Sequence, residues 1–345
     1  MRAVAFTEFG APLSVVSRPV PSAAPHGAVI EVRATGVCRS DWHGWQGHDP
    51  DIRLPHVPGH EFAGVVSSVG ELVTRWRPGD RVTVPFVCAC GTCDTCVAGD
   101  HQVCENQTQP GFTHDGSFAE FVRVDYADVN LVQLPDDLDF VPAAALGCRF
   151  ATAFRAVQGQ GQVRPGQWVA VHGCGGVGLS AVMIATGLGA RVIAIDVSEA
   201  ALARALDVGA VAAVDSRELP NAGARVAELT DGGAHVSIDA FGSEATCAAS
   251  IESLRRRGRH VQVGLLPEAL GRPRVPMARV VSLELSVLGS HGMAAHDYGP
   301  MLQMVTDGTL MLDRLVGDVI ALDEAPHALA AMTGSAAPGT RVIVP

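Results

Sequence analysis

From about residue 166 onward, short apolar runs rich in β-branched residues alternate with stretches of helical character. A parallel sheet wound with helices has this alternation, because each strand is covered on both faces and each crossover is a helix. The candidate strands are residues 168–172, 191–195, 211–214, 235–239, 259–263 and 285–289. The candidate helices are residues 177–188, 198–208 and 243–254. Six strands with intervening helices predict an α/β fold with a doubly wound parallel sheet.

The chain before residue 166 has a different character, with strand-like runs broken by Gly and Pro at residues 27–35, 61–70 and 80–84. After residue 290 come two helix-like stretches, 296–305 and 324–332, and a closing strand at 341–344. A terminal strand needs a sheet to join, so we expect the tail to return to the first part of the chain. We predict a β-rich, barrel-like domain of residues 1–150 and 290–345, and a doubly wound domain of residues 151–289.

Composition narrows the function classes. The chain is 48% hydrophobic and 18% charged, which is typical of a globular protein and too apolar for a disordered one. All 25 basic residues are Arg, which excludes a Schiff-base lysine and the lysine of a P-loop. The net charge of −11 gives no basic footprint for nucleic acid or a membrane surface, so we expect small-molecule partners.

No apolar run approaches the ~18 residues of a membrane span, and the first ten residues lack the apolar core of a signal peptide. We therefore expect a cytoplasmic protein.

A glycine motif follows the first strand of the doubly wound domain. Residues 168–172 run into Gly173-Cys174-Gly175-Gly176-Val177-Gly178, a G-x-G-x-x-G sequence that opens a helix. Glycines at these positions allow a tight turn and a close approach of the backbone to a pyrophosphate, and the helix N-terminus favours its negative charge. Asp196 ends the next strand 18 residues after Gly178, where a carboxylate can hold the ribose hydroxyls. This context predicts a Rossmann-type domain that binds NAD in preference to NADP, because Asp196 repels a 2′-phosphate.

Four cysteines crowd into one short loop. Cys90, Cys93 and Cys96 are each separated by two residues, and Cys104 follows. Four thiolates close a tetrahedral site and leave no position for a substrate, which describes structural zinc. An iron–sulfur cluster is the alternative, but its usual fourth cysteine comes sooner and precedes Pro. We expect reduced thiols throughout the chain, with Cys174 and Cys247 as packing residues and no assigned role for Cys88.

A third group of residues is scattered along the chain. Cys38, Ser40, Asp41 and His43 lie in one segment, His60 and Glu61 follow Gly59, and Cys148 follows Gly147. A catalytic zinc needs three protein ligands and an open position, and two cysteines with one histidine form a known set. With the four-cysteine loop and the glycine motif in the same order, the chain resembles the zinc-containing medium-chain alcohol dehydrogenases over essentially its whole length.

The resemblance implies a GroES-like catalytic domain beside the Rossmann domain, with the chemistry in the cleft between them. It implies that Cys38, His60 and Cys148 bind the catalytic zinc. Glu61 would lie beside the zinc as a neighbouring carboxylate or an alternate ligand, and Asp41 would orient His60. It further implies two zinc ions per chain and reversible hydride transfer between an alcohol and NAD, with an aldehyde or ketone as the oxidised partner.

The resemblance also implies roles around the substrate and cofactor. Ser40 would touch the substrate hydroxyl and pass its proton through the nicotinamide ribose to His43. Arg39 and Arg341 match positions near the cofactor pyrophosphate, and Thr152 matches one beside the nicotinamide. Trp45, Phe86 and Phe118 fall where such enzymes line the substrate channel, although aromatic residues there also suit a domain core. His48 and His56 have no assigned role.

Alternatives remain at this point. Polyol-specific relatives often have Glu or Asp in place of Cys148, so the sequence disfavours a strict polyol substrate. Compact bacterial members of the family are often tetramers, so we expect a homo-oligomer, with a tetramer favoured over a dimer. Two other functional classes share this fold: a zinc-free quinone reductase, and a non-catalytic NAD-binding regulatory protein. Intact metal-binding groups disfavour the first, and the presence of Ser40 and His43 disfavours the second.

Overall fold

The computed structural model describes residues 1–217, 219, 221–266, 272–333 and 339–345. The chain divides into two units, and the tail belongs with the N-terminal part. One unit consists of Met1–Ala151 and Gly292–Pro345, and the other consists of Thr152–His291.

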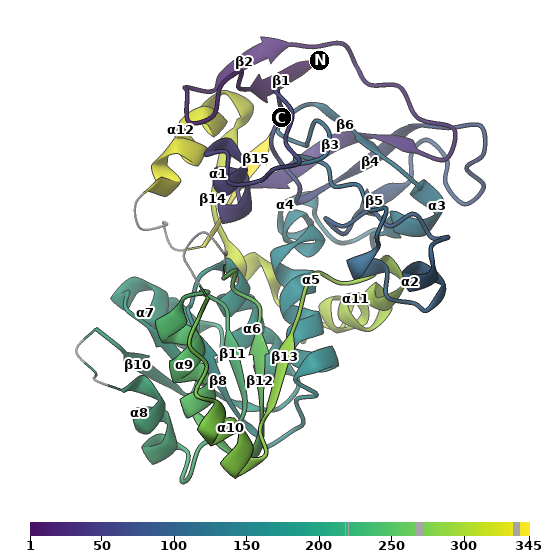
Figure 1. Ribbon diagram of the computed structural model, residues 1–345. Coiled ribbons are helices and arrows are strands. Elements are labelled where there is room, and N and C mark those ends of the chain that lie inside the picture. The colour runs from purple at the N-terminus through teal and green to yellow at the C-terminus, as the bar shows by residue number, and fades with distance from the viewer. Residues whose placement is uncertain (218, 220, 267–271, 334–338) are drawn as a thin grey trace. The chain divides into compact units, whose positions relative to one another are not determined.

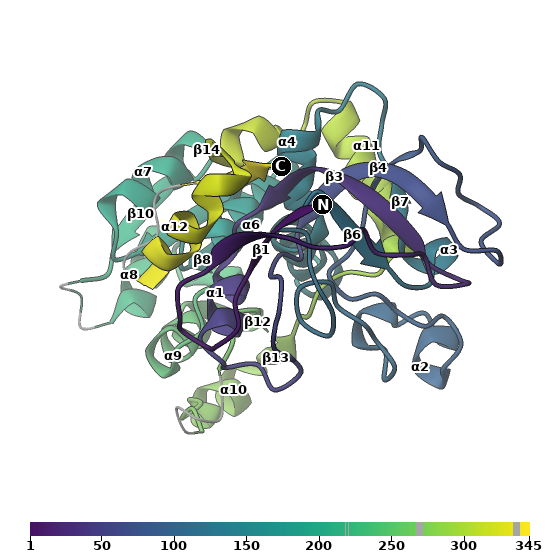
Figure 2. The same ribbon diagram turned by 90° about the horizontal axis from the view of Figure 1, so that it is seen from above.

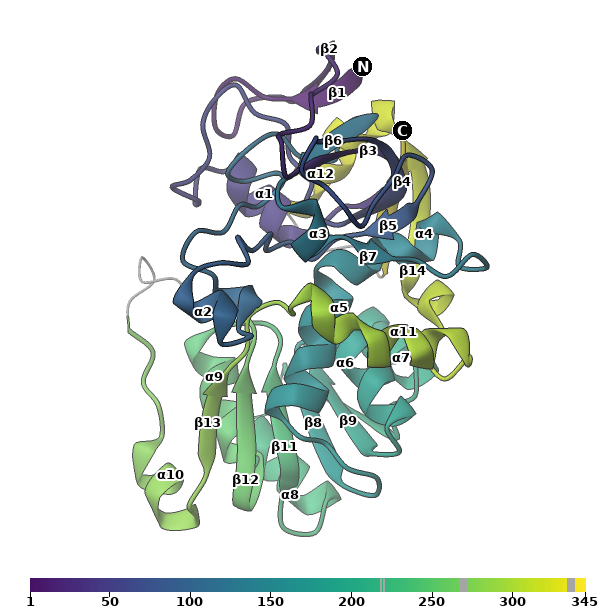
Figure 3. The same ribbon diagram turned by 90° about the vertical axis from the view of Figure 1, so that its right-hand side faces the viewer.

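The Thr152–His291 unit contains one six-stranded sheet (Figure 3). Its strands are β8 (Trp168–His172), β9 (Arg191–Asp196), β10 (Ala212–Asp215), β11 (Ala234–Asp239), β12 (Leu254–Gln262) and β13 (Ser286–Gly289). All neighbouring strands are parallel, in the order β10-β9-β8-β11-β12-β13. This order is that of two mononucleotide-binding halves that meet between β8 and β11, which confirms the predicted doubly wound sheet.

Helices cover both faces of this sheet. Side chains alternate between the two faces along each strand, and apolar residues on both faces need to be buried. The helices are α6 (Gly176–Gly187), α7 (Glu199–Asp207), α8 (Ala222–Leu229), α9 (Glu244–Glu252) and α10 (Met277–Leu283) (Figure 1). Ala170, Ile193 and Val214 form one buried cluster with Val226 of α8. Val169 and Val192, which point to the opposite face, are also fully buried. Burial on both faces explains why these strands are continuous apolar runs in the sequence.

The other unit is built on a largely antiparallel sheet (Figure 2). Its strands are β3 (Ala28–Gly36), β4 (Phe62–Val69), β5 (Arg81–Thr83), β6 (Phe121–Val124), β7 (Val132–Gln133), β14 (Val316–Ala321) and β15 (Thr340–Val344). The order is β14-β15-β3-β4-β5-β7, and β6 also pairs with β3. Val342 and Ile343 of β15 lie opposite Gly36 and Thr35 of β3, so the terminal strand joins the sheet of the N-terminal residues. A separate hairpin is formed by β1 (Arg2–Ala5) and β2 (Ser14–Ser17).

Short helices complete this unit. They are α1 (Arg39–Trp45), α2 (Asp94–Val97), α3 (Ala127–Asn130), α4 (Phe140–Ala143), α11 (Tyr298–Thr306) and α12 (Ala325–Ala330), and α5 (Arg149–Phe154) runs across the boundary between the units.

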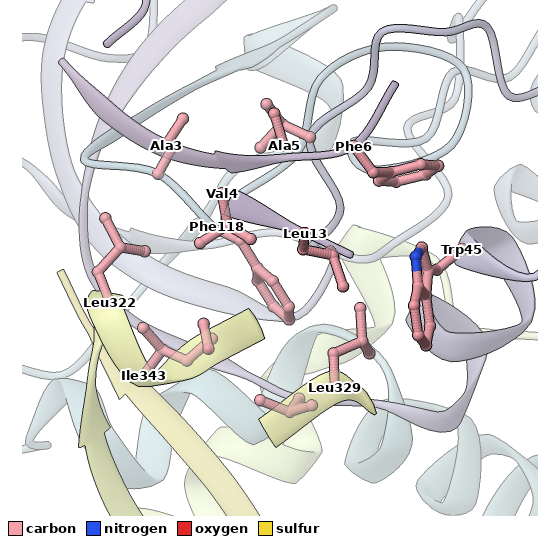
Figure 4. Close-up of a cluster of buried hydrophobic side chains, with 14 of the residues drawn as sticks. Ala3, Val4, Ala5, Phe6, Leu13, Trp45, Phe118, Leu322, Leu329 and Ile343 are labelled. Atoms are coloured by element: carbon pink, nitrogen blue, oxygen red, sulfur yellow. The ribbon is translucent and has the colours of Figure 1, made fainter. Parts of the chain in front are cut away.

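A hydrophobic cluster holds the two ends of the chain together (Figure 4). Val4 and Phe6 near the N-terminus pack with Phe118, with Leu329 of α12 and with Ile343 of β15, and all five are at most 1% exposed. Burial of one such side chain contributes roughly 1.5–3 kcal/mol to folding. The cluster also contains Val37 and Val57, so it anchors the part of the chain that carries the candidate site residues Cys38 to His60.

No single helix within the described residues is long and apolar enough to cross a membrane. One pair of consecutive helices, Phe140–Gly147 and Arg149–Gln160, has the combined length and apolar composition of a membrane span, but the two helices are bent by 57° relative to each other.

Candidate active site and metal centres

Three predicted zinc ligands come together in the first unit. One ligand atom each from Cys38, His60 and Cys148 lies within 4.8 Å of the other two. Cys38 is the N-cap residue of α1, and His60 stands just before β4. Cys148 ends the 3₁₀ turn Ala144–Gly147. The loop ends of three separate elements thus place two thiols and one imidazole around one point.

Asp41 fixes the orientation of this group. Its Oδ1 accepts hydrogen bonds from His60 Nδ1 at 2.7 Å and from the Gly59 amide at 3.1 Å, and its Oδ2 accepts from the Cys38 amide at 2.9 Å. Because a carboxylate only accepts, the proton of the neutral imidazole is on Nδ1 and the lone pair is on Nε2. Nε2 of His60 is buried and has no hydrogen-bond partner among the described residues. A metal ion is the partner that this donor set requires.

The electrostatics of the group also suit a cation. A hydrogen bond from the Cys148 thiol lowers the pKa of Cys38 well below its ordinary value, and His60 and Arg149 add to the effect. The Cys38 thiolate in turn raises the pKa of Cys148. Burial opposes the imidazolium of His60, but the Asp41 carboxylate raises the pKa of His60 well above its ordinary value. The site therefore stabilises a thiolate and a positive charge together, and a bound cation replaces the protons.

Glu61 is turned toward Arg149. The Arg149 amide donates to Glu61 Oε1 at 2.8 Å, and the guanidinium donates to Oε2 through Nε at 2.7 Å and through Nη2. Glu61 is 0% exposed, and an ion pair this deep needs several hydrogen bonds to offset the cost of desolvation. Gly36 leaves room for the pair, since a Cβ there would lie 2.6 Å from Glu61 Oε2. Arg149 is the residue that sequence reasoning missed; a charged residue within the apolar stretch 140–154 was its only signal.

The four cysteines of the loop also form a ligand group. The thiols of Cys90, Cys93, Cys96 and Cys104 all lie within 4.8 Å of one another. Cys90 Sγ accepts hydrogen bonds from the amides of Thr92 and Cys93, both at 3.4 Å. Bonds from Thr92 lower the pKa of Cys90 to about 5, whereas burial raises the pKa of Cys96 to about 12. The loop thus prepares a thiolate, and a metal is needed to remove the remaining protons.

Cys88 lies outside both ligand groups. It is fully buried in a hydrophobic cluster of the β3–β4 sheet, and burial raises the pKa of its thiol. Cys88 is therefore a core residue.

The glycine motif has the geometry that a dinucleotide requires. Gly173 has φ +88°, and a Cβ there would lie 2.7 Å from Phe241 Cβ. A Cβ at Gly178 would lie 1.8 Å from the Gly173 carbonyl, so only glycine fits at that position. Gly175 is the N-cap of α6, has open space at its Cβ position, and leads into the first helical residues Gly176 and Val177. Free backbone amides at a helix N-terminus are suited to bind a phosphate group.

Asp196 lies at the end of β9, next to the motif. Its Oδ2 accepts a hydrogen bond from the Cys174 amide at 2.6 Å, and its Oδ1 accepts from the Ser198 amide at 2.8 Å. The two backbone bonds fix the carboxylate, and each oxygen still has a lone pair for a ligand hydroxyl.

Comparisons with known proteins agree on one family. Residues 24–136 match the family described as Alcohol dehydrogenase GroES-like domain, and residues 176–307 match the family described as Zinc-binding dehydrogenase. An alcohol dehydrogenase of Geobacillus stearothermophilus is 34% identical over 312 residues, which are 89% of this chain and 90% of the relative. The chain belongs to the zinc-containing medium-chain alcohol dehydrogenases.

Further relatives of this family cover nearly the whole chain. A sorbitol dehydrogenase of Halalkalibacterium halodurans is 32% identical over 339 residues, 95% of this chain and 96% of the relative. The solved structure of the alcohol dehydrogenase TADH from Thermus sp. ATN1 has a TM-score of 0.90 and 34% identity, and the match covers 100% of this chain and 99% of that one. These matches confirm the predicted family, its GroES-like and Rossmann folds, and an oxidoreductase that uses zinc and a nicotinamide cofactor.

Two residues with expected family roles lie on α1. Ser40 Oγ is 3.9 Å from Cys38 Sγ, beside the ligand group. His43 lies one turn further on, and its Nδ1 is 3.0 Å from Nδ1 of His48. Burial lowers the pKa of His43, and the nearby His48 and Arg39 lower it further. The sequence assigned no role to His48, and the contact with His43 is visible only in the structure.

The expected cofactor contacts outside the motif are placed as follows. The Arg39 guanidinium donates to the Met332 carbonyl and lies 5.3 Å from the centroid of the Trp42 ring. Arg341 forms an ion pair with Asp318 at 3.0 Å. Thr152 Oγ1 is buried and has no hydrogen-bond partner among the described residues.

The aromatic residues were open to two interpretations. Trp45 and Phe118 belong to the hydrophobic core that holds the chain ends, which agrees with the interpretation of these two as core residues. Phe86 and Phe112 instead flank the ligand histidine, with ring centroids 6.3 and 5.2 Å from that of His60. His56 is also a core residue: it is 2% exposed, and its Nε2 lies 2.8 Å from the Gly111 carbonyl.

Proposed function

We propose that this chain is an alcohol dehydrogenase that transfers hydride reversibly between a small alcohol and NAD, with an aldehyde or ketone as the oxidised product. The observation that carries the proposal is the Cys38, His60 and Cys148 group, in which the buried Nε2 of His60 has no partner among the described residues. Three ligands leave a fourth position for a substrate oxygen.

The residues around this group hold and orient the metal ligands. Cys38, His60 and Cys148 hold the ion, and Asp41 keeps His60 in the tautomer that binds through Nε2. A zinc ion held there would supply a Lewis acid that lowers the pKa of the substrate hydroxyl, and bound NAD⁺ would supply the hydride acceptor. The Glu61 carboxylate accepts a hydrogen bond from the Arg149 guanidinium, so Glu61 is a neighbour of the metal ligands and not itself a ligand.

The proton of the alcohol leaves along α1. Ser40 Oγ lies next to the ligand group. It would accept the hydroxyl proton while it releases its own through the nicotinamide ribose, because a serine is too weak a base to keep a proton. His43 takes the proton, since its lowered pKa keeps the ring neutral near pH 7. The contact between His43 Nδ1 and His48 Nδ1 requires one ring to donate and the other to accept, so His48 is the next carrier toward solvent.

NAD is the preferred cofactor. The backbone amides of Gly175, Gly176, Val177 and Gly178 would bind the pyrophosphate, because they lie at the N-terminus of α6 after the turn at Gly173. Asp196 accepts the ribose hydroxyls, and Val197 beside it offers no charge to a 2′-phosphate. By the resemblance to the family, Arg39 and Arg341 would contact the pyrophosphate, and Thr152, whose buried Oγ1 has no partner among the described residues, would lie beside the nicotinamide.

The four-cysteine loop holds a second, structural zinc. A quinone reductase of this fold has no need of either metal group, and a regulatory NAD-binding protein has no need of the open one. Cys148 disfavours a strict polyol substrate, so we propose simple alcohols and their carbonyl partners as the substrate class.

We further propose a homo-oligomer, with a tetramer favoured, and a cytoplasmic location in which the nine cysteines stay reduced.

One experiment tests the activity. The purified protein is analysed for metals and assayed for NADH formation with a panel of primary, secondary and poly-alcohols, before and after removal and restoration of zinc. We expect about two zinc ions per chain. Turnover should be lost when the zinc at Cys38, His60 and Cys148 is removed and should return when that zinc is restored. Turnover that survives complete removal of zinc would refute the metal-dependent mechanism, and iron in place of zinc would refute the assignment of the four-cysteine loop.

A further inference from the structure

A cavity lined by arginines lies in the Thr152–His291 unit, away from the glycine motif. Its volume is ≈ 140 Å³, and five arginines and one histidine line it: Arg164, Arg255, Arg256, Arg257, Arg259 and His235. The chain has 25 basic residues and a net charge of −11, so one fifth of its positive side chains meet in one small space. The net charge of −11 argued against a basic patch, although four of these arginines lie in one run, Arg255-Arg256-Arg257-Gly258-Arg259.

The cavity lies at the amino ends of the strands, whereas the glycine motif lies at their carboxyl ends. Arg164 precedes β8, His235 is the second residue of β11, and Arg255 to Arg259 lie in the first half of β12. In a parallel sheet these are the amino ends of neighbouring strands, whereas the glycine motif follows the carboxyl end of β8. The five residues of β8, at about 3.3 Å each, separate the two ends of the strand by roughly 16 Å. The cavity is therefore a separate site from that of the cofactor.

A break in the β11–β12 ladder brings the arginines out of the sheet. Ala234 pairs with Leu254 and Val236 pairs with Arg259, so β12 advances five residues while β11 advances two. The extra residues, 255–258, bulge from the ladder, and Arg257 has a φ of +59°, in the left-handed region. Arginine adopts this conformation only at a cost that the surrounding structure must offset. The bulge turns several consecutive arginines toward one cavity.

Hydrogen-bond donors exceed acceptors at this cavity. The Trp168 amide donates to His235 Nδ1 at 3.0 Å, which puts the proton of the neutral ring on Nε2. Arg255 Nη1 lies 3.0 Å from that Nε2, so two N–H groups face each other. The guanidinium groups of Arg164 and Arg256 have no hydrogen-bond or ion-pair partner among the described residues. Each of these donors is satisfied if an oxygen that only accepts is placed among them.

Two members of the group are already paired, which leaves the others to bind a ligand. Arg257 donates to Glu284 at 3.1 Å, and Arg259 donates to Gln162 at 3.0 Å. None of the described residues that line the cavity is Asp or Glu. Guanidinium groups this close repel one another, and an anion between them removes that repulsion.

We propose that this cavity is a binding site for a phosphate-class oxoanion. Its ≈ 140 Å³ is close to the roughly 150 Å³ cavity that holds one benzene molecule, so one tetrahedral anion with a few waters fits. Guanidinium groups match such anions because their N–H groups form parallel pairs that bind two oxygens at once. Free inorganic phosphate and the phosphate group of a small organic ester share this chemistry.

The test measures thermal unfolding of the zinc-loaded protein with NADH present, so that the cofactor site is filled. Inorganic phosphate is titrated at constant ionic strength, with sodium chloride as the compensating salt. We expect a midpoint that rises and then saturates, because a ligand that binds only the folded state stabilises it by mass action. A rise that stays linear, or one that chloride matches at equal ionic strength, would reflect a general salt effect and would overturn the proposal.

Variants assign the effect to the cavity. In the Arg164→Gln/Arg256→Gln double variant, both changes are at exposed side chains, so the fold is retained and the apparent Kd for phosphate should rise at least about tenfold. Arg225→Gln is the matched control, since Arg225 is exposed on α8 of the same unit and does not line the cavity. An equal response of wild type and double variant, or an equal loss in the control, would place the phosphate elsewhere and overturn the proposal. Tighter binding of glycerol 3-phosphate than of inorganic phosphate identifies an organic ester as the ligand, and the reverse identifies the free anion.

Discussion

Replacement of Asp41 by Asn tests how this chain holds its catalytic metal. Asp41 receives three hydrogen bonds, from His60 Nδ1 and from the amides of Gly59 and Cys38. An amide of the same size keeps one oxygen, but its NH₂ group faces a donor where the carboxylate had a second acceptor. The variant therefore loses the negative charge behind His60 and at least one buried hydrogen bond, while the side-chain volume is conserved.

The magnitude follows from these contacts. Loss of a hydrogen bond to a charged group costs about 1.5–3 kcal/mol, and each 1.4 kcal/mol is a factor of about ten in an equilibrium constant. We expect zinc affinity at the Cys38, His60 and Cys148 group to fall about 10- to 100-fold, in the range found when partners of metal-bound histidines are removed. The four-cysteine loop shares no contact with Asp41 and should keep its zinc.

The assay is a competition between the protein and a colorimetric zinc chelator, with metal content measured in parallel. In Asp41→Asn, one zinc per chain should move to the chelator at a concentration about 10- to 100-fold lower than in wild type, and turnover should fall with it and recover in excess zinc. Asp51→Asn is the control, because Asp51 is exposed on the following loop and should leave both zinc affinities unchanged. Unchanged affinity in Asp41→Asn, or equal loss of both zinc ions, would refute this account of the site.

Three further predictions concern stability, cofactor choice and pH. Cys104→Ser should lower the thermal midpoint by several degrees and the zinc content from about two to about one per chain; full stability with loss of turnover alone would mean that the two metal sites have exchanged roles. Asp196→Ala should reduce the ratio of kcat/KM for NAD over NADP by at least about tenfold, whereas equal wild-type efficiency with both cofactors would show that another residue contacts the ribose. His48→Asn should raise the pKa of His43, since the nearby His48 lowers it, and should move the acidic limb of kcat/KM for alcohol oxidation to higher pH, because oxidation needs neutral His43. An unchanged limb, with chemistry shown to be rate-limiting by a deuterium isotope effect, would remove His43 from the proton path.

Features that depend on neighbouring residues were readable from the sequence. The glycine motif is local in part: a Cβ at Gly178 would clash with the Gly173 carbonyl of the same strand–turn–helix unit, whereas Gly173 leaves room for the distant Phe241. The four-cysteine loop is local too, since its ligands lie within fifteen residues. Buried strands were readable because their apolar runs are continuous. Strand ends were less so: β12 begins at Leu254, five residues before the expected 259, because the arginine bulge interrupts its pattern.

Features that depend on residues far apart in the chain were not readable. The pair of Glu61 and Arg149 joins positions 88 residues apart, and no local pattern indicates it. Two of the helices that cover the six-stranded sheet, α8 and α10, were not among the expected stretches. α8 is short and contains Gly223 in its first turn, and α10 contains the β-branched Val280 and Val281, and these residues lower helix propensity. Trp45 and Phe118 were open to two interpretations because an aromatic residue has the same sequence signal in a channel and in a core.

The two metal groups differ in what holds them before a metal binds. In the four-cysteine loop, the bonds that support the thiolates come from the loop itself: Cys104 Sγ accepts from the amides of Cys90 and Asn106 at 3.4 and 3.3 Å. The fold of that loop and its metal therefore depend on each other. The Cys38, His60 and Cys148 group is held instead by the α1 cap, by Asp41 and by segments anchored in the sheet. Loss of metal there removes chemistry and leaves the scaffold, which is why His60→Ala should abolish turnover with little loss of stability while Cys104→Ser should do the opposite.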